Sequence, residues 1–555
     1  MRKAHVWLAV LLCALLIIVY SHTSSVSVSW RNFSEDSGDL ITCAYALGIP
    51  HPTGYPLYVL LGRLFSLVMP GGVAFRITLL SILAAAAAPV FLFLALARIL
   101  PGRSGLLASL AGALSLAFSR HYWSQAVVAE VYGLHLLFLA IIVYLVLRWA
   151  GEGTEEGAHE AKVAAPARPG SGGPDRRRYL LLASYVLGLS FANHMLSVLT
   201  LAFVLVMAVR PKRGPTMTLK TLVSCAALFC VGLTLYVYLP VRSARNPELN
   251  WGDPETWRQF TWVVTGAQYH FRLLASPLSA ALSRLWPGPF LAAGWPALCI
   301  AALGLAPGRG HNRLRVALLA VLVLDLIVVA VYEIPDPPAY FVPGSFALCA
   351  LTALGVQRVA SAVETKRLLA RGRTPVEDNA SRRLRWRGTA VAAALLLVCV
   401  LPPALGNARY VDASSDLTPY VSGRATFRAV EHNALIVSEY DGRTFALWFF
   451  RETEFRQSHA GSVVVFKYLL VWPWYVHNLR TLHPDLRVPH AGPMEAAVLA
   501  LVDANIDSRP VYTVRDDPAL KPFFELKPVL GGAAPLFRVE RKTSATEAGE
   551  NPSAP

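Results

Sequence analysis

Long apolar runs recur along this chain, and they restrict the folds open to it more than any other feature of the sequence. A run of about 18 to 25 apolar residues can cross the roughly 30 Å hydrocarbon core of a bilayer as a helix. Because lipid offers the backbone no hydrogen-bond partner, each segment has to pair its own amides, which a helix does. Of the 555 residues, 55% are hydrophobic and 15% are charged, whereas soluble domains average about a quarter charged. The sequence therefore predicts a polytopic α-helical membrane protein.

The apolar runs predict eleven membrane-spanning helices. They cover residues 5–21, 74–99, 104–119, 129–149, 179–194, 195–209, 220–241, 285–306, 315–332, 339–357 and 388–405. No small-residue cleavage site follows the first run, so we expect a retained helix and not a signal peptide. Residues 55–69 are apolar but short and carry Arg63, and we expect an interfacial helix there.

The net charge of +16 is concentrated in particular loops. Loops rich in Lys and Arg stay in the cytoplasm, and with residues 55–69 at the interface the basic loops all fall on one side. We therefore expect a cytoplasmic N-terminus and an extracytoplasmic C-terminus, in the inner cell membrane or, in a eukaryote, the ER membrane. This pattern accounts for the charge without nucleic acid.

The predicted membrane domain covers residues 1–405, and its loops are expected to differ in character. The outer loops are 22–73 and 242–284, the flexible cytoplasmic linker is 150–178, and the basic cytoplasmic loop is 358–387. Residues 406–541 contain alternating runs, such as 434–438, that are typical of strands. We expect them to form a small mixed α/β extracytoplasmic domain, followed by a disordered polar tail at 542–555.

Polar and aromatic side chains gather at the outer face of this predicted topology. Two carboxylates, Asp36 and Asp39, precede a His51-Pro52 turn in the first loop. Other outer segments contribute Arg120, Glu130, Arg242, Trp251, Tyr269 and Asp336. Ionisable groups at membrane depth are costly and usually face a cavity or a partner. Such a set could abstract a proton from a hydroxyl, hold a phosphate and stack on a sugar.

Each of these groups also has a structural interpretation. Asp36 can cap the helix that follows it, and Glu130 lies where a helix dipole favours an acid. His51-Pro52 can stiffen a turn, and tryptophans form belts at membrane interfaces. No Walker loop, Gly-x-Gly-x-x-Gly, His-Glu-x-x-His or Gly-x-Ser-x-Gly motif occurs. Six of the seven cysteines lie in predicted spans, which supports neither a disulfide framework nor a thiolate metal site.

Several motifs together resemble one family of membrane proteins. They occupy residues 36–41, 47–58, 119–132, 188–194, 238–242, 246–254 and 336–340, and more loosely 434–448. The chain is similar to family 117 of the GT-C glycosyltransferases, in which a eukaryotic member is a protein O-mannosyltransferase. The likeness is strong over about residues 28–345 and loose over the remainder.

This resemblance implies a reaction. A sugar, mannose in the eukaryotic member, would pass with inversion from a polyprenyl-phosphate donor to a hydroxyl of a protein Ser or Thr, or of a glycan, on the extracytoplasmic face. The lipid-linked donor would be a co-substrate and no cofactor is implied. Some GT-C enzymes need a divalent metal, but the sequence offers no support for a metal site.

The resemblance also implies roles for residues. An acidic residue of the first outer loop would be the catalytic base, either Asp36 or Asp39, and family members often carry Glu at the position of Asp39. Glu130 corresponds to a second acidic position. The candidates for substrate binding are His51, Arg120, Arg242, Trp251, Tyr269 and Asp336.

Two other functions fit a polytopic chain. A transporter or flippase for a lipid-linked or small substrate would place charges near the bilayer midplane and show inverted repeats. The notable charges here lie in outer loops, and no mirrored halves are visible. A non-catalytic scaffold is the second alternative.

Overall fold

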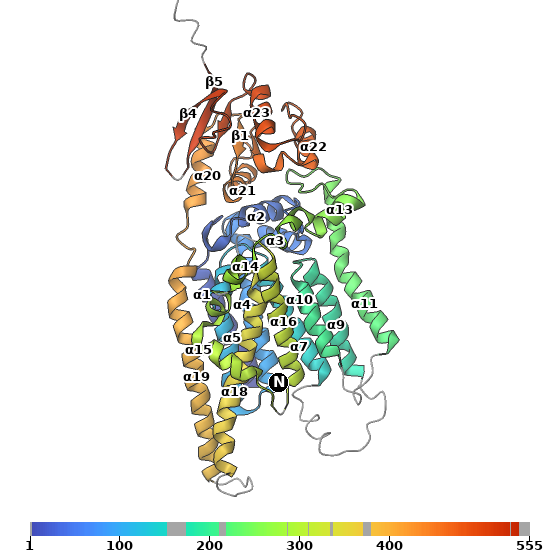
Figure 1. Cartoon of the computed structure of the whole chain (residues 1–555), viewed down its shortest axis with the longest axis vertical. Helices are drawn as coiled ribbons and strands as arrows, with labels where there is room; N and C mark the ends of the chain where they lie inside the picture. The colour runs from blue at the N-terminus through green and yellow to red at the C-terminus, as the bar shows by residue number, and fades with distance from the viewer. Residues whose placement is uncertain are drawn as a thin grey trace, which may run out of the picture.

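The computed structural model describes residues 3–151, 174–209, 218–285, 287–308, 310–333, 337–369, 379–532 and 534–542. These residues form a long helical bundle with a smaller sheet-containing domain at one end (Figure 1). Asp336, most of the predicted 150–178 linker and nearly all of the predicted 542–555 tail lie outside the described residues.

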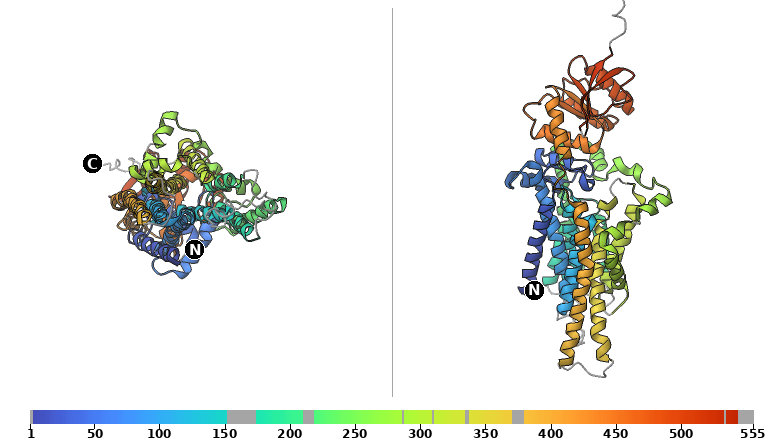
Figure 2. Two further views of the ribbon diagram at one scale, coloured as in Figure 1. Left: turned by 90° about the horizontal axis from the view of Figure 1, so that it is seen from below. Right: turned by 90° about the vertical axis from the view of Figure 1, so that its left-hand side faces the viewer.

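The bundle consists of helices that run along the long axis of the molecule. They are α1 (Lys3–His22), α4 (Val73–Ile99), α5 (Gly102–Ala117), α7 (Tyr132–Ala150), α9 (Pro174–Phe191), α10 (Ser197–Ala208), α11 (Leu219–Leu233), α15 (Pro287–Leu305), α16 (Asn312–Val331), α18 (Val342–Leu369) and α19 (Asn379–Val411). The N-terminus of α1 points away from the sheet-containing domain (Figure 2).

Seven helices in the described part of the chain are long and apolar enough to cross a membrane. They agree with the prediction of a polytopic helical membrane protein. Four predicted spans remain: α10 has 12 residues, α5 has 16, α9 has 18 but carries Asp175 and Arg176–Arg178 near its start, and α15 is broken at Gly294, where φ is +73°. The predicted total of eleven membrane spans therefore stays a prediction.

The basic segment predicted as a loop at 358–387 is helical wherever it is described. α18 continues to Leu369 and α19 begins at Asn379. Arg and Lys are good helix formers, so a helix can continue past the end of its apolar stretch. α19 also continues to Val411, past the predicted domain boundary at 405.

Short helices gather at the end of the bundle that carries the sheet (Figure 1). They are α2 (Ser37–Ala46), α3 (Pro56–Val68), α6 (Arg120–Ala126), η2 (Thr234–Val237), α12 (Tyr238–Ser243), α13 (Trp257–Val264), η3 (Ala267–Arg272), α14 (Leu278–Leu285) and α17 (Pro337–Tyr340). α3 leaves Leu64 and Leu67 exposed on one face. An uncovered apolar face is what an interfacial helix requires.

We call residues 418–541 the C-terminal domain. It contains α20 (Thr418–Ala429), β1 (Leu435–Ser438), α21 (Asp441–Glu452), β2 (Val463–Phe466), η4 (Lys467–Leu469), α22 (Pro473–Leu482), α23 (Met494–Asn505), β3 (Val511–Thr513), β4 (Phe524–Leu530) and β5 (Leu536–Arg541). The strand order is β2-β1-β3-β5-β4. β1 is parallel to β2 and β3, and β5 is antiparallel to β3 and β4. The carboxyl ends of β1, β2 and β3 therefore meet at one edge.

The C-terminal domain packs closely on the first loop of the bundle. Helix α21 crosses α2 at Gly38, where an added Cβ would lie 2.7 Å from the backbone of Phe445. The indole Nε1 of Trp30 donates to the carbonyl oxygen of Gly442 at 2.9 Å. Asn478 donates to the carbonyl oxygen of Asn250 at 2.8 Å, which fixes a second loop.

The close approach at Gly38 makes a prediction about domain docking. We expect Gly38→Val to separate α21 from α2 and to cost about 1–3 kcal/mol, the usual cost of overpacking. Limited proteolysis should then cut the C-terminal domain faster than in the wild type. Gly406→Val is the matched control, because no atom lies within 4 Å of an added Cβ there. Equal cleavage rates for the two variants would contradict the docking described.

Candidate active site

A cavity of about 740 Å³ lies between the short helices of the bundle and the C-terminal domain. This volume is within the range of small-molecule sites. Its wall is rich in aromatic rings, namely Trp30, Trp251, Tyr269, Phe271, Tyr440, Phe445, Phe466, Tyr468 and Trp472. Its ionisable groups are Glu35, Asp36, His51, Arg272, Glu439, Asp441 and Arg443.

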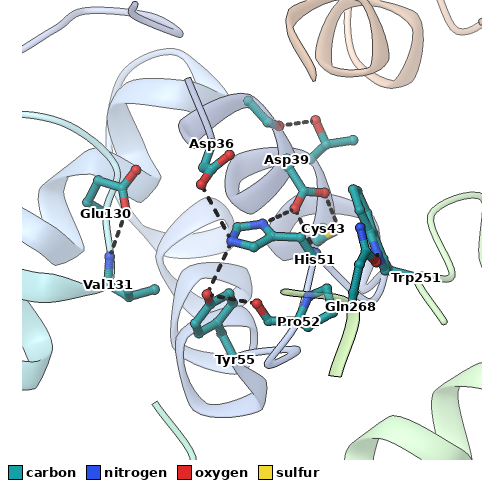
Figure 3. Close-up of polar contacts among 12 residues, drawn as sticks. Asp36, Asp39, Cys43, His51, Pro52, Tyr55, Glu130, Val131, Trp251 and Gln268 are labelled. Atoms are coloured by element: carbon teal, nitrogen blue, oxygen red, sulfur yellow. Dashed lines mark hydrogen bonds and ion pairs between the residues drawn. The ribbon is translucent and has the colours of Figure 1, made fainter. Parts of the chain in front are cut away.

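Asp39 holds His51, which lines this cavity, and Figure 3 shows the contact between the two side chains. Asp39 lies in the first turn of α2 and is 0% exposed. Its Oδ2 accepts hydrogen bonds from the backbone amide of His51 at 2.9 Å and from the imidazole Nδ1 at 2.8 Å. The second bond places a proton on Nδ1 and fixes the orientation of the ring.

The other ring nitrogen of His51 faces Asp36 and Tyr55. Nε2 lies 3.6 Å from Oδ2 of Asp36 and 3.1 Å from the hydroxyl of Tyr55. Burial alone would lower the pKa of His51, but the neighbouring carboxylates, Asp36 and then Asp39, outweigh it and raise the pKa to about 9. His51 is therefore an imidazolium at neutral pH.

Asp36 is the carboxylate of the pair that reaches the cavity. It occupies the N-cap position of α2, yet its side chain makes no capping hydrogen bond. Its side chain is 47% exposed, against 0% for Asp39. Removal from bulk water raises the pKa of the Asp36 carboxyl above its usual value, while the His51 imidazolium counteracts this. Asp36 therefore does not cap α2 with its side chain, although its position in the sequence would allow it.

Tyr269 reaches the same cavity from η3, and Trp251 reaches it from the loop after α12. A parallel bridge between Ile49 and Asn250 joins this loop to the His51 segment. It places the rings of His51 and Trp251 with centroids 6.2 Å apart. The indole Nε1 of Trp251 donates to Oε1 of Gln268 at 2.8 Å, which fixes the ring.

Glu130 lies deeper, beside the cavity. It is 4% exposed and precedes α7. Its Oε2 accepts a hydrogen bond from the amide of Val131 at 3.3 Å, and its own backbone amide donates to Ser81 at 3.1 Å. Its charge contributes to the raised pKa of His51, after the charges of Asp36 and Asp39. Figure 3 shows Glu130 and Trp251 on opposite sides of His51.

The two predicted arginines lie elsewhere. Arg242 donates to the carbonyl oxygens of Leu47 and Ala46 and so closes the C-terminus of α2. The guanidinium of Arg120 lies 4.6 Å from the ring centroid of Tyr410. The structure thus brings together Asp36, Asp39, His51, Trp251 and Tyr269, with Glu130 behind them, and places both arginines outside the cavity wall.

The contribution of the C-terminal domain to the cavity was not predicted from the sequence. Asp441 begins α21, shortly after β1 ends at Ser438, and lines the cavity. Removal from bulk water, together with Asp36 and Glu35, raises the pKa of Asp441 to about 7. Its position just beyond the carboxyl end of a predicted strand was a usable signal, because such positions often line sites in α/β sheets.

Arg272 was also missed, and it supplies a cation to the cavity. Its Nη1 donates to the carbonyl oxygen of Glu333 at 3.4 Å. Its Nε is buried and has no hydrogen-bond partner within the described structure. Among the described residues, no group of three or more His, Cys, Asp or Glu side chains could hold a metal ion.

The fold defines the class of protein. The chain resembles ArnT from Cupriavidus metallidurans in the apo state, with a TM-score of 0.60 and 13% identity, over 99% of this chain and 100% of that one. The structure of ArnT bound to undecaprenyl phosphate gives a TM-score of 0.58 at 12% identity, with the same coverage. The chain is therefore an integral membrane protein with a fold similar to that of ArnT.

Sequence similarity narrows the comparison. Residues 36–216 match the family model described as the protein O-mannosyl-transferase TMEM260 N-terminal domain. The chain is 33% identical over 252 residues to protein O-mannosyl-transferase TMEM260 of Mus musculus, covering 45% of this chain and 33% of that protein. It is 25% identical over 266 residues to protein O-mannosyl-transferase tmem260 of Dictyostelium discoideum, covering 47% of this chain and 30% of that protein.

The chain spans about a third of the length of these curated relatives. The region matched by the family model includes Asp36, Asp39, His51, Arg120 and Glu130. The predicted resemblance to O-mannosyltransferase-like GT-C proteins is confirmed.

Proposed function

We propose that this protein is a membrane glycosyltransferase. It moves a sugar, mannose by the names of its relatives, from a polyprenyl-phosphate donor to a polypeptide Ser or Thr hydroxyl at the extracytoplasmic face. The observation that carries this proposal is the Asp36–His51–Asp39 arrangement at the wall of an aromatic cavity. An ionised carboxylate facing a cavity of this size suits proton abstraction from a bound hydroxyl.

Asp36 is the catalytic base in this proposal. Its carboxylate takes the proton of the acceptor hydroxyl while the hydroxyl oxygen attacks the anomeric carbon. The bond from that carbon to the donor phosphate oxygen breaks, and the polyprenyl phosphate leaves with the electron pair. Because attack comes from the face opposite the leaving group, the configuration of the anomeric carbon inverts.

Asp39 and His51 act through Asp36. Asp39 is fully buried and so positions His51 and does not itself contact the acceptor. The His51 imidazolium keeps Asp36 ionised, while removal from bulk water makes Asp36 more basic than an exposed aspartate. The raised pKa gives the Asp36 carboxylate a higher proton affinity, which a general base near neutral pH requires.

The donor is held by the remainder of the cavity wall. Trp251 and Tyr269 offer flat apolar faces of the kind that stack on sugar rings. Arg272 brings a guanidinium with an unsatisfied buried Nε, which suits the donor phosphate. In this proposal Arg272 replaces Arg120 and Arg242, which the sequence analysis named among the candidates for substrate binding.

Substitution of Arg272 tests the phosphate assignment. We expect Arg272→Gln to raise the KM for the lipid-linked donor about tenfold to a hundredfold, since a hydrogen bond to a charged group contributes about 1.5–3 kcal/mol. Arg258→Gln is the matched control, because Arg258 is exposed on neighbouring α13, away from the cavity wall. An unchanged donor KM in Arg272→Gln would remove Arg272 from the donor site.

The proposed activity is tested by comparing donor classes. Purified protein in detergent is given labelled sugar as a polyprenyl phosphate or as a nucleoside diphosphate, together with a Ser/Thr peptide. Label should reach the peptide from the lipid-linked donor alone. No transfer from either donor, with solute uptake by the protein in vesicles, would favour the transporter.

A further inference from the structure

A second cavity, of about 360 Å³, lies in the C-terminal domain. We call it the strand-end crevice, because its residues follow the carboxyl ends of the three parallel strands. Glu439 follows β1, Lys467 follows β2, and Arg515 and Asp517 follow β3. The other wall consists of Met494, Glu495 and Val498 of α23, with Pro518 and Ala519.

The topology of the sheet places the strand-end crevice at a switch point. The chain goes from β1 to β2, which lies on one side of β1 in the sheet. β3 lies on the other side of β1, and the chain goes from β3 to β4 and β5, which lie farther out on that side. Loops that leave neighbouring strands in opposite directions leave a gap between them. Open α/β sheets bind ligands in such gaps, outside the carboxyl ends of the strands.

The strand-end crevice adjoins the candidate active site. Glu439 lines both cavities, and the next two residues, Tyr440 and Asp441, line the larger one. The two residues after β2 are shared between the cavities in the same way: Lys467 lines the crevice, and Tyr468 lines the larger cavity. A chain-like ligand with one group at Asp36 could therefore extend past Glu439 into the crevice.

The charges of the strand-end crevice exclude the donor phosphate. Lys467 forms ion pairs with Glu439 at 3.1 Å and with Asp517 at 3.0 Å. Arg515 forms an ion pair with Glu439 at 2.9 Å. Both cations are thus already paired, and Glu495 adds a third carboxylate to the wall. The net charge of the wall favours a neutral or cationic ligand.

The residues that line the crevice also favour a polypeptide over a sugar as its ligand. The larger cavity is walled by aromatic rings, whereas the lining residues of the crevice within the described structure include none. Its apolar surface comes from Met494, Val498, Pro518 and Ala519, and its polar surface from charged side chains. Apolar patches beside carboxylates suit an extended peptide with basic side chains.

We propose that the strand-end crevice binds the polypeptide that carries the acceptor hydroxyl and prefers Lys or Arg near that hydroxyl. This rests on the proposed function, which places the hydroxyl at Asp36. The C-terminal domain then has a distinct task, since the bundle supplies the base while the sheet edge selects the acceptor.

The test uses the full-length protein in detergent and a fluorescein-labelled peptide with one Ser or Thr flanked by lysines. Ala519→Trp fills the crevice, and Ala500→Trp, on an exposed part of α23, is its matched control. Glu495→Lys reverses a wall charge, and Glu525→Lys, on β4, is its control. Peptide affinity is read by fluorescence anisotropy, and the KM values for peptide and donor come from the transfer assay.

We expect each crevice variant to weaken peptide binding about tenfold, the effect of roughly 1.4 kcal/mol. The KM for the peptide should rise in parallel while the KM for the lipid-linked donor stays constant. Wild-type peptide affinity in a folded Ala519→Trp or in Glu495→Lys would overturn the proposal. Because Glu495 is exposed, Glu495→Lys carries the test if Ala519→Trp fails to fold.

The two proposals fail in different ways. If the wild type binds the peptide, loses affinity in the crevice variants and yet transfers no sugar, the proposed function is wrong and the crevice remains a peptide site. If sugar is transferred and the crevice variants keep the wild-type KM for the peptide, the crevice assignment is wrong and the proposed function remains.

Discussion

Asp36→Asn should lower kcat for sugar transfer about a hundredfold to ten-thousandfold, the range that general-base catalysis contributes. Asparagine has nearly the same shape as aspartate but cannot accept the proton of the acceptor hydroxyl as a base. The KM for the donor should change little, because the other residues of the cavity wall hold the donor. Transfer of labelled sugar to a Ser/Thr peptide, measured under initial-rate conditions, gives both constants.

The control for this substitution is Glu35→Gln. Glu35 is the neighbouring residue and lines the same cavity. Its loss removes one carboxylate from the wall but leaves the Asp36–His51 pair in place, so we expect a much smaller effect. If Asp36→Asn kept the wild-type kcat while Asp39→Asn lost it, the assignment of the base to Asp36 would be wrong.

The second large effect concerns pH. His51 has a pKa raised to about 9, so its imidazolium is present below that pH and is lost as the pH rises through it. Neutral His51 no longer forms the ion pair that holds the Asp36 carboxylate in position. Activity should therefore fall on the alkaline side near pH 9. It should also fall on the acid side as Asp36 takes up a proton, at a pH above that of an ordinary aspartate because its pKa is raised.

Asp39→Asn should move the alkaline limb of this profile to lower pH. Without the Asp39 carboxylate, burial lowers the pKa of His51 with less opposition, and one neighbouring opposite charge typically accounts for about 1–3 pKa units. The profile of kcat/KM against pH gives the shift. Cys43→Ser is the control, because the Cys43 sulfur lies 3.5 Å from Oδ1 of Asp39 and its replacement leaves the carboxylate charged. An alkaline limb at the same pH in Asp39→Asn would exclude His51 as its source.

The sequence predicted the class of fold because lipid imposes a strong constraint. A long apolar run has few alternatives to a helix, so the helices of the bundle could be located from composition. Their number could not be fixed in the same way. α10 and α15 show why, since one is short and the other is broken at Gly294, and neither length nor hydropathy decides whether such a segment crosses the bilayer.

The centre of the site could be predicted in part. Asp36, Asp39 and His51 lie close together in the sequence, but their geometry depends on a chain reversal. Leu47 ends α2 in the left-handed conformation, with φ of +56°, and the chain returns so that His51 reaches Asp39. The two carboxylates could not be told apart before that geometry showed one to be buried and the other open to the cavity.

Contributions from distant parts of the chain were the hardest to predict. Arg242 and Arg272 are both basic residues of the segment 242–284, and only the contacts show that one closes α2 while the other faces the cavity. Asp441 is far from Asp36 in the sequence and comes from a different domain. The packing of α21 on α2 at Gly38 brings the two together.

The most direct test of this account is the mass and anomeric configuration of the product. Purified wild-type protein is incubated with β-linked polyprenyl-phosphate mannose and a Ser/Thr peptide, and the peptide is analysed by mass spectrometry and NMR. We predict one added hexose, α-linked to a Ser or Thr hydroxyl, which forms about a hundredfold to ten-thousandfold more slowly with Asp36→Asn. An unmodified peptide with the wild type, or a β-linked product, would contradict the proposed inverting transfer with Asp36 as the base.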